Sequence, residues 1–162
     1  MEFSPSEILQ MAEELERRGI DFYAGLIGKT NDPEAKKIFS LLENQEKQHL
    51  SFFQGIHQQL NEDRDPLVDT LDETTNYLGA IVENSILGKS LKGMDLLQGD
   101  SSVSRALAVG IEVEKESVLF YQGLEVMILP QKREWLNRVI QEEKKHFLTL
   151  IEIKKDVDGR AI

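Results

Sequence analysis

The chain has 162 residues, with no cysteine and with 29 acidic against 19 basic side chains, which gives a formal net charge of −10. The lack of cysteine excludes disulfides, thiolate zinc sites, iron–sulfur clusters and a cysteine nucleophile, and the acidic balance argues against a nucleic-acid partner. Because no stretch approaches the ~20 apolar residues of a membrane span and the N-terminus does not resemble a signal peptide, we expect a cytoplasmic protein without a membrane partner.

The first part of the chain predicts a hairpin of two helices over about residues 5–60. Apolar residues recur at helical spacing from about Ser6 to Lys29, and the preceding Ser4-Pro5 is a typical helix start. An Asn-Asp-Pro turn at 31–33 ends this helix and begins a second one, which extends to about Leu60. A connection this short requires the two helices to be antiparallel neighbours.

A connector over about residues 61–100 separates this hairpin from the next. Its first residues, NEDRDP, predict a turn, and the stretch DETTNYLGAIVENSILG at 72–88 has helical periodicity that β-branched residues and glycines interrupt. We therefore expect one or two short helices here. Helices of about 25 residues are ~38 Å long, so a connector of this length can return the chain to its starting end.

The last part of the chain predicts a second helical hairpin, over about residues 101–156. Its first helix is expected to follow the Gly-Asp-Ser-Ser cluster at 99–102 and to run to about Leu129, where Pro130 breaks it and opens the final helix. The polar tail after Asp156 is expected to fray. The sequence thus predicts an all-α fold, a single domain over residues 1–162, in which two antiparallel helix pairs form a four-helix bundle with a long crossover.

The two hairpins carry the same motif. The pentapeptide FYAGL at 22–26 returns as FYQGL at 120–124, and a glutamate precedes each copy by six residues, Glu16 in the first half and Glu114 in the second. Both glutamates lie on or beside the apolar stripe of their helix, where an unpaired carboxylate would cost several kcal/mol. This internal duplication therefore places acidic groups where a partner of opposite charge is needed.

Each half continues with a Glu-x-x-His motif, at residues 46–49 and 143–146. Residues at i and i+3 project ~60° apart on a helix, so both side chains can reach one centre. Carboxylate and imidazole together suit iron, manganese or zinc, and four carboxylates around two divalent cations sum to zero charge. The predicted metal ligands are Glu16, Glu46, His49, Glu114, Glu143 and His146.

Other residues near these motifs have more than one interpretation. Tyr23 and Tyr121 follow Glu16 and Glu114 by seven residues, which places them on the ligand face. They are either core aromatics or partners of the centre, through a hydrogen bond to a ligand carboxylate or through redox chemistry. The paired Gly25 and Gly123 are expected at close helix crossings.

Five acids near the motifs and the third histidine are expected at the surface. His57 has Gln54, and no glutamate, three residues before it, so the ligand motif is absent there. Glu142 cannot replace its neighbour in the second motif, because only Glu143 has the i to i+3 relation to His146. The acids expected on solvated helix faces are Glu13, Glu14, Glu112, Glu116 and Glu142.

Together these motifs resemble the rubrerythrin-type branch of the ferritin-like di-iron carboxylate proteins over nearly the whole chain. The resemblance implies a ferritin-like bundle that encloses two metal ions, most simply iron, with manganese or zinc as alternatives, and no heme. It assigns bridging positions to Glu46 and Glu143, terminal positions to Glu16 and Glu114, and one nitrogen per metal to His49 and His146.

The resemblance also implies a function and shows where this chain departs from the family. Peroxide-reducing members carry a rubredoxin domain with four cysteines and an additional glutamate three residues after the ligand of the third helix. This chain has no cysteine, and Ser117 occupies that position. We expect an oxidoreductase that reduces hydrogen peroxide or dioxygen with a separate, rubredoxin-like electron donor, and a homodimer. A ferroxidase or iron-handling protein and a non-catalytic metal-binding bundle are the alternatives.

Overall fold

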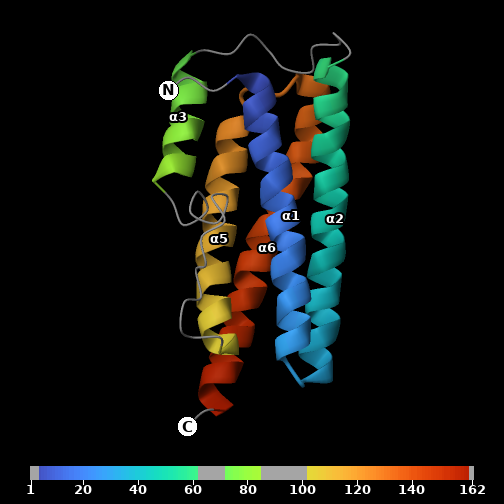
Figure 1. Cartoon of the computed structure of the whole chain (residues 1–162), viewed down its shortest axis with the longest axis vertical. Helices are drawn as coiled ribbons and strands as arrows, with labels where there is room; N and C mark the ends of the chain where they lie inside the picture. The colour runs from blue at the N-terminus through green and yellow to red at the C-terminus, as the bar shows by residue number, and fades with distance from the viewer. Residues whose placement is uncertain (1–3, 62–71, 85–101, 161–162) are drawn as a thin grey trace.

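The computed structural model describes residues 4–61, 72–84 and 102–160, and its regular structure there is helical. Four long helices form a bundle, and the shorter α3 lies beside the N-terminal end of α1 and the C-terminal end of α5 (Figure 1). The predicted all-α, ferritin-like four-helix bundle is confirmed. Within the described ranges the helices are α1 (Pro5–Lys29), α2 (Pro33–Asn61), α3 (Asp72–Glu83), α5 (Val103–Leu124) and α6 (Pro130–Arg160).

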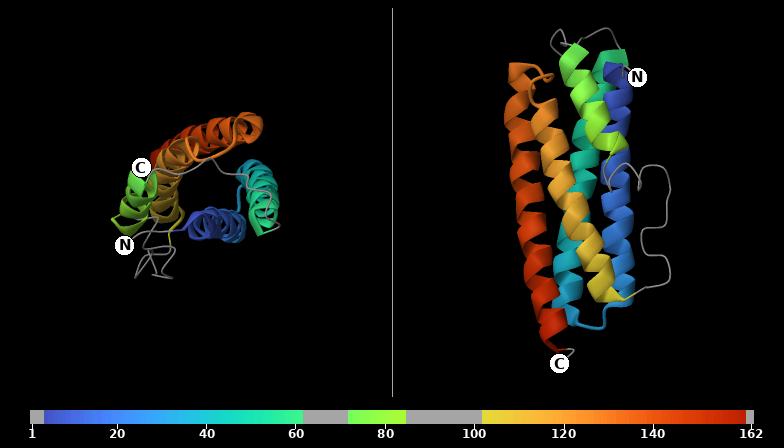
Figure 2. Two further views of the ribbon diagram at one scale, coloured as in Figure 1. Left: turned by 90° about the horizontal axis from the view of Figure 1, so that it is seen from above. Right: turned by 90° about the vertical axis from the view of Figure 1, so that its left-hand side faces the viewer.

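The bundle is built from two antiparallel pairs, α1 with α2 and α5 with α6. Seen from above, the four long helices surround one central axis (Figure 2). Within the connector, α3 is the short helix that the periodicity of 72–88 predicts, while the expected turn at 61–66 and the remainder up to 101 lie almost wholly outside the described residues. None of the described helices has the length and the apolar character needed to cross a membrane.

Local hydrogen bonds explain where the first hairpin begins and turns. The Ser4 hydroxyl accepts from the Glu7 N–H while the Glu7 carboxylate accepts from the Ser4 N–H at 2.7 Å, which forms a capping box ahead of α1. At the turn, the Asp32 carboxylate accepts from the Glu34 N–H at 3.0 Å. These contacts satisfy backbone donors that a helix start leaves free.

Among the described residues, the hydrophobic core consists of two clusters with a polar layer between them. One cluster lies at the end near α3, with Leu9 and Phe53 among its members, and the other at the opposite end, with Leu26 and Phe39. On each of the four long helices, the predicted ligands lie in sequence between the residues of these two clusters. The apolar clusters therefore close both ends of a buried polar layer at mid-height.

Glycines permit close contacts between helices, but only at one of the two positions expected. A Cβ at Gly123 would lie 2.6 Å from Leu78 of α3, so the expectation of a close crossing holds there. Gly110, which the sequence did not single out, faces the ring of Phe22 on α1 in the same way. A Cβ at Gly25 would meet no other helix within 4 Å, so its assignment to a crossing was wrong.

Two helix ends differ from those predicted. Helix α5 ends at Leu124 rather than near Leu129, because a turn in which the Met127 N–H bonds the Leu124 carbonyl at 3.0 Å precedes Pro130. The tail expected to fray instead continues α6 to Arg160, which pairs with Asp32 at 3.1 Å. Contacts distant in sequence thus hold residues whose local composition is polar.

Candidate metal centre

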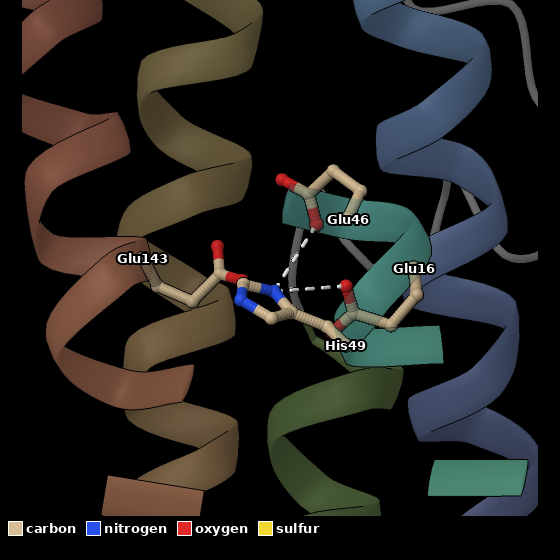
Figure 3. A group of neighbouring side chains, drawn as sticks. All are labelled: Glu16, Glu46, His49 and Glu143. Atoms are coloured by element: carbon tan, nitrogen blue, oxygen red, sulfur yellow. Dashed lines mark ion pairs between the residues drawn. The ribbon is translucent and has the colours of Figure 1, made fainter. Parts of the chain in front are cut away.

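The six predicted ligands meet in the polar layer at mid-height of the bundle. One glutamate comes from each of α1 and α5, and a Glu-x-x-His pair comes from each of α2 and α6. All six side chains are buried. Figure 3 shows the carboxylates of Glu16, Glu46 and Glu143 directed toward the ring of His49. The geometry brings the predicted residues together, and their role as ligands stays a prediction.

The six residues form two overlapping groups, each with the composition of a metal site. The first contains Glu16, Glu46, His49 and Glu143, and the second contains Glu46, Glu114, Glu143 and His146. Within each group, one ligand atom from every residue lies within 4.8 Å of the others. Because Glu46 and Glu143 belong to both groups, the arrangement suits two adjacent cations that share two carboxylates.

Buried polar atoms without a hydrogen-bond partner indicate that these residues fit a metal. The Nδ1 atom of His49 lies 2.8 Å from a Glu143 oxygen, and that of His146 lies 3.0 Å from a Glu46 oxygen. Both Nδ1 atoms nevertheless lack a hydrogen-bond partner, as do one oxygen of Glu16 and one of Glu143. Buried polar atoms are normally paired, so four orphaned atoms around one point fit residues that would hold cations.

The outer nitrogen of each histidine is held from the opposite half of the chain. His49 Nε2 lies 2.7 Å from a carboxylate oxygen of Glu142, and His146 Nε2 lies 3.1 Å from the amide oxygen of Gln45. An acceptor at Nε2 requires that nitrogen to donate its hydrogen, which leaves Nδ1 free to bind a metal. The expectation that Glu142 lies on a solvated face was wrong, since its side chain is 25% exposed and bonds a predicted ligand.

The two tyrosines also connect the halves. The Tyr23 hydroxyl donates to the Glu114 carboxylate and the Tyr121 hydroxyl donates to the Glu16 carboxylate. Burial, followed by the charge of the bonded carboxylate, raises the pKa of each tyrosine well above its usual value. Both phenols therefore stay protonated as donors. Of the interpretations left open, the structure shows the hydrogen bond to a predicted ligand.

One small residue, Gly19, borders a shared carboxylate, and another, Ser117, follows Glu114 by three residues. A Cβ at Gly19 would lie 3.0 Å from Glu46 Cδ, so a larger residue on α1 would crowd this shared carboxylate. Ser117 is buried, and its hydroxyl donates to the Val113 carbonyl at 2.9 Å. The serine hydroxyl is therefore used within its own helix.

Burial and charge divide the four glutamates into two pairs, whose pKa values shift in opposite directions. Burial, followed by repulsion from Glu46 or Glu143, raises the pKa values of Glu16 and Glu114 well above normal. Burial would raise those of Glu46 and Glu143 as well, but the adjacent imidazoles lower both pKa values below normal. The shared carboxylates are therefore the ionised ones.

Burial and nearby carboxylates act on the pKa values of the two histidines in the opposite sense to their action on Glu46 and Glu143. Burial alone would lower their pKa values, but the facing carboxylates raise the pKa of His49 strongly and that of His146 to about 9. Without a metal, two ionised carboxylates then balance two imidazolium rings, while the raised pKa values favour the protonated forms of Glu16 and Glu114. The cluster is thus close to neutral, which limits the cost of burying it.

The third histidine forms a separate network on the α1–α2 hairpin. His57 Nδ1 lies 2.6 Å from a Glu13 oxygen, and His57 Nε2 lies 2.9 Å from the Ser6 hydroxyl. The His57 side chain is only 15% exposed and Glu13 is buried, so the expectation of surface positions for both was wrong. Neither residue belongs to a metal-binding group among the described residues. By contrast, Glu14 pairs with arginines at the surface, as expected.

Comparison with known proteins agrees with this geometry. No significant match was found among curated proteins or among solved structures. A family model, Rubrerythrin, matches residues 7–154, a span that contains both Glu-x-x-His motifs and both isolated glutamates. The match covers most of the chain, and the buried glutamate and histidine groups fit a family of di-iron carboxylate proteins. The chain therefore belongs to the rubrerythrin family.

Proposed function

We propose that this protein is a binuclear non-heme iron oxidoreductase that reduces hydrogen peroxide or dioxygen with electrons from a separate donor. The observation that carries the proposal is the pair of overlapping ligand groups, which share Glu46 and Glu143 and contain four buried atoms without a hydrogen-bond partner. Bound iron would supply one electron per ion and positive charge close to the oxidant. Reduction of one peroxide to two waters consumes two electrons and two protons. Two such ions together would supply the two electrons.

The described residues support this chemistry by holding the centre in place. Glu46 and Glu143 are positioned to bind both ions, while Tyr23 and Tyr121 hold one oxygen of each terminal carboxylate. The apolar clusters at both ends restrict bulk water at the centre. A dry, preorganised pocket strengthens electrostatic interactions with a bound ion.

The sequence supports an external source of electrons. The 162 residues contain no cysteine, so they cannot hold a thiolate-bound iron, and the proposed electrons come from a rubredoxin-like donor outside them. Ser117 has a hydroxyl in place of a carboxylate, and this hydroxyl donates to the Val113 carbonyl. The proposed reduction therefore uses the six ligands alone. A homodimer remains our expectation from the family resemblance, and a cytoplasmic location remains an expectation as well.

Anaerobic loading with Fe(II), followed by rapid mixing with hydrogen peroxide or with dioxygen, tests the proposal. We expect oxidation of about two irons per chain and repeated turnover when a reduced rubredoxin-like protein is supplied. The matched control is the Glu46→Ala/Glu143→Ala double variant, which should bind no stoichiometric iron. Single oxidation followed by iron storage in a heavy particle would instead favour iron handling. Bound iron that neither oxidant oxidises would contradict the proposal and leave a metal-binding bundle.

A further inference from the structure

The two metal groups have matching ligands, but different groups hold their histidines. Glu142 and Gln45 occupy equivalent places, each immediately before the glutamate of a Glu-x-x-His motif and each bonded to the histidine of the other half. One acceptor is a carboxylate at 2.7 Å and the other is a neutral amide at 3.1 Å. The internal duplication thus preserves the position of the contact and changes its charge.

This difference has a direct consequence for the imidazole as a ligand. A carboxylate that accepts from Nε2–H draws positive charge toward itself and makes the opposite nitrogen a stronger donor to a cation. A neutral amide fixes the same ring orientation with a weaker hydrogen bond. The ligand set around His49 is therefore better suited to hold a cation than the set around His146.

The surroundings of Glu142 allow it to supply this charge at low cost. Its side chain is 25% exposed, and it lines a small surface cavity between α2 and α6 together with His49 and Trp135. Water can therefore solvate part of the carboxylate while one oxygen stays on Nε2. A fully buried carboxylate at that place would carry the desolvation cost that the four central glutamates already carry.

We propose that Glu142 is a positioning residue that makes the metal bound by Glu16, Glu46, His49 and Glu143 the tighter of the two. Gln45 is its uncharged counterpart at the His146 group. The inference rests on the proposed two-metal centre and deepens it, because it assigns an order of filling to two sites with the same ligand types.

Reciprocal single substitutions provide matched variants of nearly equal size. Changing an outer partner of a metal-bound histidine typically costs about 10- to 100-fold in affinity. Glu142→Gln is expected to weaken the tighter step by about 10-fold and so bring the two dissociation constants together. Gln45→Glu is expected to strengthen the weaker step by a similar factor. Both variants keep an oxygen acceptor at the same place, so the bundle should fold, which circular dichroism of the metal-free proteins checks.

Anaerobic Fe(II) titration against a chelating indicator measures both steps without any assay of turnover. To assign the steps, the titration is repeated in His146→Ala, which keeps the His49 group, and in His49→Ala, which keeps the His146 group. Glu142→Gln should weaken binding in the first background and leave the second unchanged. If a single-site background binds no iron, the stepwise titrations of the two reciprocal variants decide.

The outcomes separate this inference from the proposed function. Two unequal steps that Glu142→Gln brings together support the inference. Two steps that Glu142→Gln leaves as in the parent, or an equal loss in both histidine backgrounds, would overturn it and leave the two-metal centre standing. A parent protein that binds no stoichiometric iron would overturn the proposed function itself.

Discussion

Loading the metal-free protein with two divalent cations should displace protons from the centre. In the metal-free state the pKa of His146 is raised to about 9 and that of His49 is raised further, so both rings are protonated at pH 7. The pKa values of Glu16 and Glu114 are raised well above normal. A bound cation requires neutral imidazole and ionised carboxylate, so all four groups must lose their protons.

The expected number of protons follows from this charge balance. Two imidazolium rings and two carboxylic acids hold about four protons, and two divalent cations replace them without a change in net charge. We expect at least about two protons per chain at pH 7, from the two imidazolium rings, and a number that rises toward about four as the pH falls and Glu16 and Glu114 become protonated. Because protons compete with the metal for the same groups, metal affinity should fall as the pH falls.

Calorimetric titration with Mn(II) or anaerobic Fe(II) in buffers of different ionisation enthalpy measures the proton count directly. The dependence of the apparent binding enthalpy on the buffer gives the number of protons released. A Glu46→Gln/Glu143→Gln variant serves as the control, because it should lose the tight binding together with the release of protons.

Binding without proton release would refute this reasoning. Carboxylates on the surface are already ionised at pH 7, so cations bound there displace almost none. Stoichiometric binding of two cations with no buffer dependence would therefore place the metals outside the buried centre.

Three further predictions test individual contacts. Gly25→Ala, at a helix position with open space, should raise the free energy of unfolding by about 1 kcal/mol. Gly19→Ala should instead lower metal affinity, because its methyl group would lie 3.0 Å from Glu46 Cδ. Equal metal affinity in the two variants would contradict this. Tyr23→Phe should destabilise the metal-free protein by about 1–3 kcal/mol in urea unfolding, since a buried carboxyl loses its donor, and an unchanged midpoint would exclude that contribution. The metal-free protein should lose stability as the pH rises from 7 through about 9, where His146 loses the proton that its raised pKa retains; a flat or rising thermal midpoint would contradict the assigned shift.

The duplication made much of the centre predictable from the sequence. Glu16 and Glu114 are recognisable because each is an acid on or beside an apolar stripe, at one distance from a repeated pentapeptide. The two Glu-x-x-His motifs are recognisable because a helix places i and i+3 on one face. These signals are local, so they do not depend on how the helices rotate against one another.

The residues that hold the histidines could not be predicted in this way. Glu142 and Gln45 precede ligands by one position, and neighbouring helix residues project about 100° apart, so only the packing of α2 against α6 decides which side chain faces across. The one sequence signal for these two residues is that each stands immediately before the glutamate of a Glu-x-x-His motif. His57 and Glu13 meet across the α1–α2 hairpin at a separation of 44 residues, which no local pattern indicates.

The end of α6, which differs from the prediction, also depends on contacts between residues distant in sequence. The tail of α6 is polar, but Arg160 reaches Asp32, a residue 128 positions earlier, and Ser104 donates to Asp158 at 2.6 Å. Such contacts depend on the assembled bundle. Sequence periodicity therefore identified the helices better than it identified their last turns.

Crystallography of the Fe(II)-loaded protein, with anomalous diffraction measured at the iron edge, tests the two-metal centre most directly. The account predicts two anomalous peaks per chain at mid-height of the bundle, one beside Nδ1 of His49 and one beside Nδ1 of His146, each within bonding distance of its ligand atoms. Glu46 and Glu143 should contact both peaks. A single peak, or peaks only at the surface carboxylates, would contradict the account.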